Sequence, residues 1–225
     1  MRTREVLASA GVRNGDEVVI PAYDSIALAE DVVQAGAVPV YADIDRDTYC
    51  LSPAAVEAAL TPRTAAVVAV HRFGHPADLR GLAALTERHH LLLHDVEEPG
   101  TDLTDVERRQ EHAAHLTARL RGVLSPRHTP GHSYQQYVVR VEGNGRPDRD
   151  AFARALRDRG VSCTVPFRAP VYRMRGFRRD MLLPETERAV DETLALPLHP
   201  RMTRRELQRT AHACNALGGL LRPAF

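Results

Sequence analysis

Apolar runs of strand length alternate with helical segments through the first hundred residues. The run AAVVAVH at 65–71 is continuous, which is typical of a strand covered on both faces. Shorter apolar runs at 17–21, 39–44 and 91–95 are separated from one another by segments long enough for a helix or crossover. This alternation favours a parallel sheet with helical crossovers. We therefore predict an α/β domain over residues 1–102.

Helix boundaries support the same alternation. Gly36 ends an expected helix over 26–35, and Ser52 followed by Pro53 begins another that ends near Leu60, because serine caps a first turn and proline fits its first position. Asp78 is placed to cap a third helix that precedes the strand at 91–95.

Residues 103–225 follow a different pattern, with one short strand or helix after another. We predict a helix that a capping box at Thr104–Glu107 opens, a strand over 132–143, a helix over 150–158, a short strand at 161–167, and a last helix that a capping box at Thr203–Glu206 opens. Such a mixture indicates a small α+β domain over residues 103–225.

Charge and composition exclude several classes of function. The formal net charge of 225 residues is +1, all 30 basic residues are arginine, and no apolar run approaches the length of a membrane span. We expect no nucleic-acid partner, no membrane partner and a cytoplasmic location, with reduced thiols at the three cysteines. Without lysine, this chain offers neither a Schiff-base amine nor a lysine base.

Asp95 lies at the carboxyl end of the strand expected at 91–95, where open α/β sheets usually bind a ligand. Together with Glu97 and Glu98 it forms either an acid/base cluster or a solvated loop. A metal site that combines Asp95 with two of His71, His75 and His94 is the weaker interpretation, and we predict none.

An arginine-rich stretch at 168–179 contains Tyr172 and Phe177. It is either a phosphate-binding segment or a solvated loop.

Segments along the chain carry a likeness to a known family. In the first half they are GDEVVIPAYDSIALA, GAVPVYADIDRDTYCLSPAAVEAALTPRTAAVVAVHRFGHPADL and HLLLHD, and in the second half VERRQEHAAHLTARL, HSYQQYVVRV, RDAFARALRDRGVSC and LALPLHPRMTRREL. They resemble the DegT/DnrJ/EryC1/StrS family of pyridoxal-phosphate (PLP) enzymes, which have the fold type I of aspartate aminotransferase and act mostly on nucleotide sugars. The resemblance implies a reduced PLP-transferase large domain with a parallel sheet, followed by a small α+β C-terminal domain.

The resemblance also implies site residues. Asp95 stands where the family pairs a carboxylate with the pyridinium nitrogen of PLP, which lets the ring accept electrons. Glu98 stands where a glutamine faces the ring's phenolic oxygen, and Ser25 where an aromatic side chain stacks on the ring. His71 and His132 match positions on the substrate side.

The region between Gly100 and Thr104 replaces a long family segment that carries the Schiff-base lysine. We therefore predict no catalytic residues for transamination and PLP that is bound non-covalently or lost. The favoured role is that of a degenerate homologue, a pseudoenzyme, acting as partner or scaffold in sugar or antibiotic biosynthesis. We expect a homo- or hetero-oligomer, such as a dimer with another aminotransferase-family protein, and a nucleotide sugar as a possible ligand. A lysine-free enzyme with acid/base chemistry on a sugar-like substrate, and a decayed fragment, remain alternatives, so whether the chain is an enzyme stays open.

Overall fold

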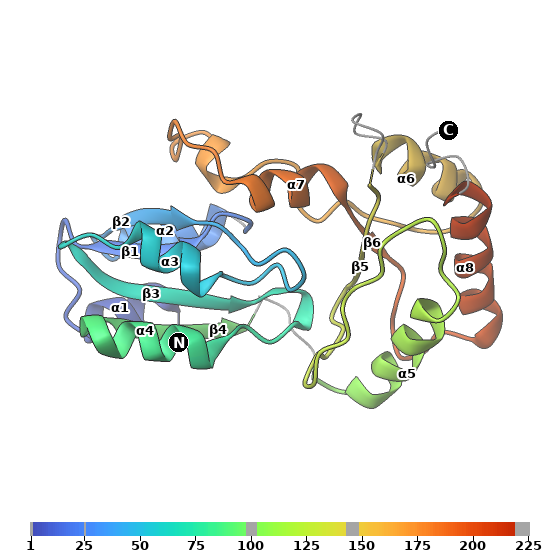
Figure 1. The fold of residues 1–225 in the computed structure, drawn as a ribbon, viewed down its shortest axis with the longest axis horizontal. Helices are drawn as coiled ribbons and strands as arrows, with labels where there is room; N and C mark the ends of the chain where they lie inside the picture. Colours follow the sequence, from blue (N-terminus) through green and yellow to red (C-terminus); the bar gives the residue numbers. More distant parts are fainter. Residues whose placement is uncertain (1, 25, 98–102, 143–148, 219–225) are drawn as a thin grey trace. The chain divides into compact units, whose positions relative to one another are not determined.

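The computed structural model of the chain describes residues 2–24, 26–97, 103–142 and 149–218 (Figure 1). Its contacts divide the chain into a first unit, made of 1–72, 76–98 and 169–188, and a second unit, made of 73–75, 99–168 and 189–225. The first unit contains helices α1 (Thr3–Ser9), α2 (Ile26–Gln34), α3 (Pro53–Ala59) and α4 (Leu79–His89), and strands β1 (Glu17–Pro21), β2 (Val38–Ala42), β3 (Thr64–His71) and β4 (Leu92–Glu97). The second unit contains helices α5 (Val106–Thr117), α6 (Arg149–Asp158) and α8 (Arg204–Gly218), and strands β5 (Tyr137–Arg140) and β6 (Thr193–Leu196), while α7 (Pro184–Glu192) runs from the first unit into the second.

The first unit is built on a four-stranded parallel sheet in the order β2-β1-β3-β4. In the centre of the sheet, Val19 of β1 lies opposite Val40 of β2 on one side and Val67 of β3 on the other. The sheet and its helical crossovers confirm the α/β fold that the apolar runs predict.

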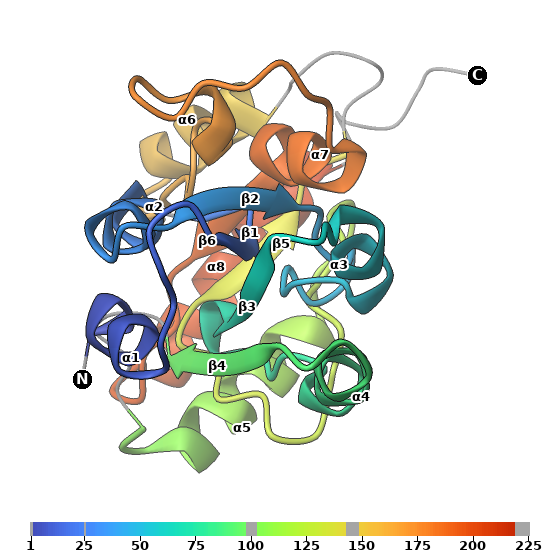
Figure 2. The ribbon, with the colours of Figure 1, turned by 90° about the vertical axis from the view of Figure 1, so that its left-hand side faces the viewer.

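Both faces of this sheet are covered (Figure 2). Successive side chains of a strand point to opposite faces. Val18 and Ile20 therefore pack with Leu28 of α2, whereas Val19 packs with Leu82 of α4. All five residues of β1 are buried, which explains the apolar residues at 18–20, whereas the buried carboxylate of Glu17 is paired with Arg63.

Strand β4 differs from β1 and β3 because it lies at an edge of the sheet. Among the described residues it pairs only with β3. None of its residues is buried, and Asp95 and Glu97 are exposed. On the outer side of β4, the backbone N–H and C=O groups therefore have no partner strand among the described residues.

Residues 169–188 return to the first unit, although the sequence pattern places them in a C-terminal domain. The amide of Val171 donates to the carbonyl of Ala22 at 3.1 Å, and the Tyr172 ring is fully buried in the same core cluster as Val18 and Ile20. This segment, with its short 3₁₀ turn at Val171–Arg173, therefore covers part of one face of the sheet.

Asp43 holds the far end of the same segment. Its carboxylate accepts from the amide of Glu185 at 3.0 Å, the amide of Thr186 at 2.8 Å and the hydroxyl of Thr186 at 2.7 Å. These donors lie in the first turn of α7, where amide groups have no partner within the helix. Asp43 thus caps a helix that begins about 140 residues further along the chain.

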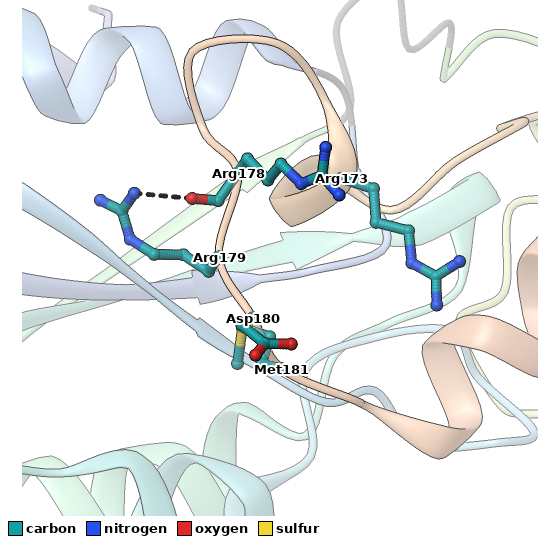
Figure 3. Close-up of a pocket in the computed structure, with 5 residues that line it drawn as sticks. All are labelled: Arg173, Arg178, Arg179, Asp180 and Met181. Atoms are coloured by element: carbon teal, nitrogen blue, oxygen red, sulfur yellow. Dashed lines mark hydrogen bonds between the residues drawn. The ribbon is translucent and has the colours of Figure 1, made fainter.

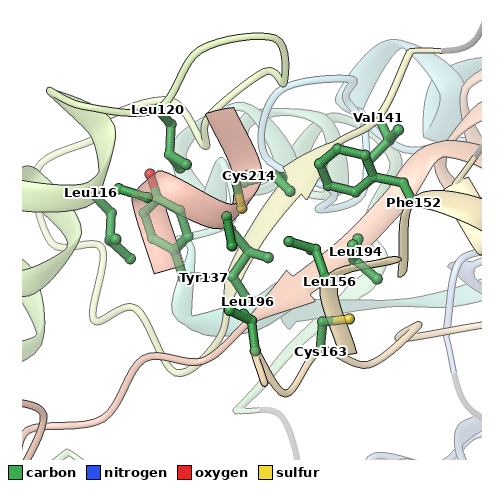
Figure 4. Packing of buried hydrophobic residues seen from close by; sticks show 14 of the residues in the cluster. Leu116, Leu120, Tyr137, Val141, Phe152, Leu156, Cys163, Leu194, Leu196 and Cys214 are labelled. Atoms are coloured by element: carbon green, nitrogen blue, oxygen red, sulfur yellow. The ribbon is translucent and has the colours of Figure 1, made fainter. Parts of the chain in front are cut away.

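The second unit combines a two-stranded antiparallel sheet with three helices. Strands β5 and β6 pair so that Tyr137 lies opposite Leu196. Their side chains share one core with α5, α6 and α8 (Figure 4). Leu116, Phe152, Leu156 and Cys214 are each less than 5% exposed in this core.

Two local predictions in this unit are wrong. Asp105, and not Thr104, precedes α5, with φ of 53° and no capping bond from its side chain, so the expected capping box does not form. The strand expected from 132 begins only at Tyr137, because the chain turns through Tyr134 at φ of 47°.

Two others are closer to the structure. Thr203 and Glu206 form the expected reciprocal capping bonds, Thr203 N to Glu206 Oε2 at 2.7 Å and Glu206 N to Thr203 Oγ1 at 3.3 Å. The short strand expected at 161–167 is reduced to one bridge between Thr164 and Ala195. Within the described residues, none of the helices combines the length and the apolar character that crossing a bilayer requires.

Candidate functional site

Asp95 and His71 meet at the carboxyl ends of β4 and β3. Asp95 lies opposite Ala69 in the register, and its Oδ2 is 3.8 Å from His71 Nε2. The Asp95 side chain is 60% exposed and that of His71 is 14% exposed. The carboxylate is therefore accessible to a ligand from solvent while the imidazole beneath it is largely enclosed.

The hydrogen bonding of His71 fixes its neutral tautomer. The backbone amide of Ala77 donates to His71 Nδ1 at 3.0 Å, so Nδ1 is an acceptor and the proton of the neutral ring is on Nε2. That proton faces Asp95. The pair therefore presents one proton donor and one carboxylate acceptor at the edge of the sheet.

A second charged pair lies at the carboxyl ends of β1 and β3. Arg72 Nη2 is 2.5 Å from Asp24 Oδ2, with side chains that are 2% and 6% exposed. The sequence analysis misses this pair, because only Arg72 directly follows a strand and Asp24 is three residues beyond β1. Both groups are buried and paired with each other, so they do not face solvent.

Cys50 lies beside Arg72. Burial raises the pKa of its thiol to about 11, against a smaller lowering by a hydrogen bond with Arg72 and by the arginine charge. Since the thiolate is the reactive form, Cys50 is an inert buried thiol at neutral pH.

The other predicted residues of this region are placed differently. Ser25 and Glu98, expected to contact the cofactor ring, lie outside the described residues, so their roles stay predictions. His94 neighbours Asp95 along β4, and neighbouring strand residues point to opposite faces, so it does not join the Asp95–His71 pair. Within the described ranges, no three His, Cys, Asp or Glu side chains gather as metal ligands would.

His132 is placed in the second unit and is 2% exposed. Its ring stacks on Tyr134 with 3.8 Å between centroids and lies 4.4 Å from the ring of His75. Its Nδ1 is 2.9 Å from the carbonyl of Gly74, and the backbone amide of Tyr134 donates to the same Nδ1 at 3.2 Å. His132 thus has a structural partner, and its role as a substrate ligand stays a prediction.

The electrostatics of His132 keep it neutral. Burial and then the charge of His75 lower its pKa to about 3, although the bond to Gly74 opposes the shift. The ring is therefore neutral in the physiological range.

Comparison with known proteins first defines the class. The fold is that of PLP-dependent aminotransferases of fold type I. The aminotransferase TlmJ from Streptoalloteichus hindustanus superimposes with a TM-score of 0.83 and 25% identity, over 97% of this chain and 84% of TlmJ. The observed parallel sheet and its crossovers are therefore those of an established enzyme architecture.

The chain belongs to the DegT/DnrJ/EryC1/StrS aminotransferase family, whose model matches residues 5–96 and 104–215. The "L-glutamine:2-deoxy-scyllo-inosose aminotransferase" of Micromonospora echinospora is 52% identical over 87 residues, which are 39% of this chain and 21% of that protein. The "pleiotropic regulatory protein" of Geobacillus stearothermophilus is 26% identical over 297 residues, which cover 90% of this chain and 78% of the relative. The family is of the sugar and antibiotic biosynthesis type.

The Geobacillus comparison also locates a difference. Its aligned region of 297 residues is longer than this whole chain of 225, so the relative contains residues without a counterpart here. The family match is interrupted between 96 and 104, directly after β4. This supports the assignment of the missing family segment to that position.

The described residues fit the family's cofactor in part. The exposed Asp95 carboxylate is free to accept a hydrogen bond from a protonated ring nitrogen, which is the electronic contribution that PLP needs from a protein. A covalent attachment does not fit, because no residue of the chain is lysine.

Proposed function

We propose that this chain does not transaminate by itself and acts as partner or scaffold for a lysine-bearing aminotransferase-family protein in sugar or antibiotic biosynthesis. The observation that carries the proposal is an accessible Asp95 in a chain without lysine. The family's aldimine lysine also moves the proton of transamination, so its loss removes the reaction and does not merely slow it. A second chain with that lysine would supply the amine that forms the aldimine and moves the proton.

Strand β4 is where we place the partner. Its outer side pairs with no other strand of the described chain, and Asp95 and Glu97 on it are exposed. Open strand edges readily pair with other chains. We choose an intact family member as occupant because the segment absent after β4 is the one that carries the lysine in the family.

Sedimentation of the chain alone and mixed with lysine-bearing family members from its own source tests the partnership. A hetero-oligomer is expected, with transamination measurable only when the partner is present. Glu97→Arg at the proposed contact should weaken the complex, whereas Glu30→Arg, the same charge reversal on the exposed face of α2, should not. A monomer that binds no family member, or transamination by the chain alone, would refute the proposal.

The fate of the cofactor is tested separately. Absorbance is recorded while the purified chain is titrated with PLP and with pyridoxamine phosphate, alongside Asp95→Asn. A saturable spectral change that disappears in Asp95→Asn supports a non-covalent ring site. The absence of any change would mean that the cofactor has been lost, and the chain would then act through its partner alone.

The Asp95–His71 pair favours a second candidate function, a lysine-free enzyme with acid/base chemistry on a sugar-like substrate. His71 offers a proton on Nε2 and Asp95 an exposed acceptor, 3.8 Å apart. Turnover of nucleotide sugars by the isolated chain, abolished in Asp95→Asn and altered in His71→Asn, would support this function. Unchanged turnover in both variants would remove these residues from it.

A further inference from the structure

Charge is divided unevenly between the two units of the chain. The first unit contains 13 arginines and 18 acidic residues, whereas the second contains 17 arginines and 11 acidic residues. The net charge of +1 is therefore the sum of an acidic first unit and a basic second unit. Such asymmetry within one chain points to a charged partner.

The arginines of the loop at 173–181, in the first unit, do not converge on one place. Figure 3 shows the guanidinium groups of Arg173 and Arg179 pointing away from each other. That of Arg173 is already paired with Glu187 Oε1 at 2.6 Å. This geometry favours a solvated loop over a phosphate-binding segment.

Six exposed arginines of the second unit lie at the end of α5 and at the start of α8, two helices that share one core (Figure 1). Asn215 of α8 joins the helices, because its side chain accepts from the amide of Arg121 at 2.8 Å and donates to the carbonyl of Arg119 at 2.8 Å. We call this set the basic face, and its members are Arg119, Arg121, Arg201, Arg204, Arg205 and Arg209.

Within the described part of the chain, no carboxylate forms an ion pair with the basic face. Arg119 and Arg121 donate to backbone carbonyls at the end of α5. The carboxylate of Glu206 in α8 instead accepts from the amide and the hydroxyl of Thr203, at 2.7 and 2.8 Å. The positive charge of the face is therefore available to a partner.

His115 shows how closely these charges are gathered. Partial burial lowers the pKa of its imidazole, and the charges of Arg119 and Arg204 lower it further. Arg119 follows α5 and Arg204 begins α8, so cations from both helices act on one ring. The Nε2 atom of His115 is enclosed without a hydrogen-bond partner among the described residues. Cations held together in this way repel one another, and an acidic ligand would relieve that repulsion.

The part of the basic face on α8 has a defined spacing. Thr203, Arg205, Glu206 and Arg209 line an open depression of about 470 Å³. Arg205 and Arg209 are four residues apart, so they lie on one side of the helix with about 6 Å between their Cβ atoms. Carboxylates four residues apart on another helix have the same spacing. Two such carboxylates could therefore each meet one guanidinium.

The composition of the two helices distinguishes among acidic partners. Neither α5 nor α8 contains Phe, Tyr or Trp, so the basic face offers no platform on which the bases of a single strand could stack. No large apolar side chain is exposed on the described residues of either helix, whereas helices that bind membrane surfaces insert such side chains. The exposed carboxylates of Glu107 and Glu111 on α5 would repel a phosphate backbone, but they can pair with basic residues of a protein.

We propose that the basic face is a docking surface for an acidic helix of a partner protein, whose carboxylates four residues apart meet Arg205 and Arg209. Guanidinium groups bind carboxylates through paired N–H donors. Complementary charge speeds association and selects the partner, and its effect weakens with salt. The docking uses no residue of the first unit, so it does not depend on the proposed function.

Fluorescence anisotropy with two labelled synthetic helical peptides tests the class of partner. One peptide carries Glu at repeated i, i+4 positions, and the other carries Gln at the same positions. The whole chain should bind the Glu peptide saturably, with an affinity that falls as salt is raised from about 50 to 200 mM, and should not bind the Gln peptide. Equal binding of both peptides, or binding of neither, would overturn the proposal.

Two further probes compare the other polyanions. Duplex RNA and vesicles of phosphatidylserine and phosphatidylcholine should each bind more weakly than the Glu peptide. Tighter binding of the RNA would replace the proposal with a nucleic-acid surface, and tighter binding of the vesicles would replace it with a membrane surface.

Charge reversal locates the contact. Arg205→Glu with Arg209→Glu should weaken binding of the Glu peptide by at least about tenfold. A peptide with Lys at the repeated positions should then bind this variant and not the wild type. Arg154→Glu with Arg157→Glu makes the same change of charge at exposed positions on α6 of the same unit and should leave binding of the Glu peptide unchanged. An equal loss in that control would mean that net charge binds the peptide and would overturn the proposal.

Folding and the β4 contact are controlled separately. Thermal unfolding of the reversed pair should match the wild type, because Arg205 and Arg209 are exposed and acidic residues near the start of a helix favour its dipole. Should that pair unfold, Arg205→Gln with Arg209→Gln removes the charge without reversing it and should weaken binding in the same way. Glu97→Arg, which tests the proposed partnership, should leave peptide binding unchanged. A change in that variant would place the peptide at β4 and overturn the assignment to the basic face.

Discussion

Arg72 and Asp24 are joined side chain to side chain at 2.5 Å in a part of the first unit where both are almost fully buried. The pair ties the carboxyl end of β3 to that of β1, next to the strand ends that carry His71. Burying two charges costs solvation free energy that their mutual attraction only roughly offsets. The two charges are therefore tolerated only together, because either one alone would be a buried, unpaired charge that lowers the free energy of unfolding.

Arg72→Met should lower the free energy of unfolding by about 3–5 kcal/mol, because it leaves the Asp24 carboxylate buried without its cation. Adding Asp24→Asn to Arg72→Met should recover part of that loss. Urea denaturation of the wild type, both single variants and the double variant measures the coupling. A double variant that is as unstable as the sum of the two single variants would contradict the pairing.

Asp43→Ala should lower the free energy of unfolding by about 2 kcal/mol, since three hydrogen bonds to the first turn of α7 are lost together. Hydrogen exchange at the amides of Glu185 and Thr186 should accelerate in the same variant. Ser52→Ala is the matched control, because Ser52 caps α3 with a single bond of 3.4 Å to Ala55 N. A larger effect in Ser52→Ala than in Asp43→Ala would show that the cap of α7 is unimportant.

The buried His132 should make the chain less stable in acid. Its folded-state pKa is about 3, whereas an unfolded histidine titrates near about 6.5. Between these two pKa values the unfolded chain binds a proton that the folded chain does not bind. The contribution of neutral His132 to the free energy of unfolding is therefore fully present above the unfolded pKa. It falls as the pH is lowered towards 3, by up to about 1.4 kcal/mol per pH unit. Melting temperatures at pH 7, 6 and 5 should fall more steeply for the wild type than for His132→Asn, and parallel curves would exclude His132 as the cause.

Gly74→Ala should be costlier than an ordinary substitution of a glycine with positive φ. At Gly74, with φ of +81°, a Cβ would overlap Ser133 Oγ and lie 2.9 Å from Gln135 N. Gly160, with φ of +74°, has nothing within 4 Å of such an atom. Gly160→Ala thus measures the backbone strain alone. Chemical denaturation should show that Gly74→Ala lowers the free energy of unfolding by about 1–3 kcal/mol more than Gly160→Ala does. Equal losses in the two variants would mean that the contact with Ser133 and Gln135 relaxes freely.

Local signals explain which parts of the fold the sequence predicts. Strands β1 and β3 are built on apolar runs, and the caps at Ser52 and Asp78 lie beside the helices that they begin. By contrast, α7 is polar, and its cap is Asp43, which is 142 residues away from the amide of Glu185. A helix that depends on so distant a partner leaves little trace in its own sequence.

The candidate site was predictable to a similar degree. Asp95 and His71 follow apolar runs, so their position at strand ends could be inferred. The exposure of Asp95 could not, because it depends on β4 being an edge strand, and strand order is set by tertiary packing. The Asp24–Arg72 pair was missed because each charge, taken alone, resembles an ordinary loop residue.

The return of residues 169–188 to the first unit has a consequence for how this chain can be inherited. No single crossover point in the gene separates one unit from the other, because the first unit takes residues from both sides of the second. A recombinant that exchanged everything after residue 102 would replace Tyr172 in the core and the donors that Asp43 caps, while keeping the strands that they were selected to fit. Exchanging one unit for that of another protein therefore requires at least two junctions in the gene.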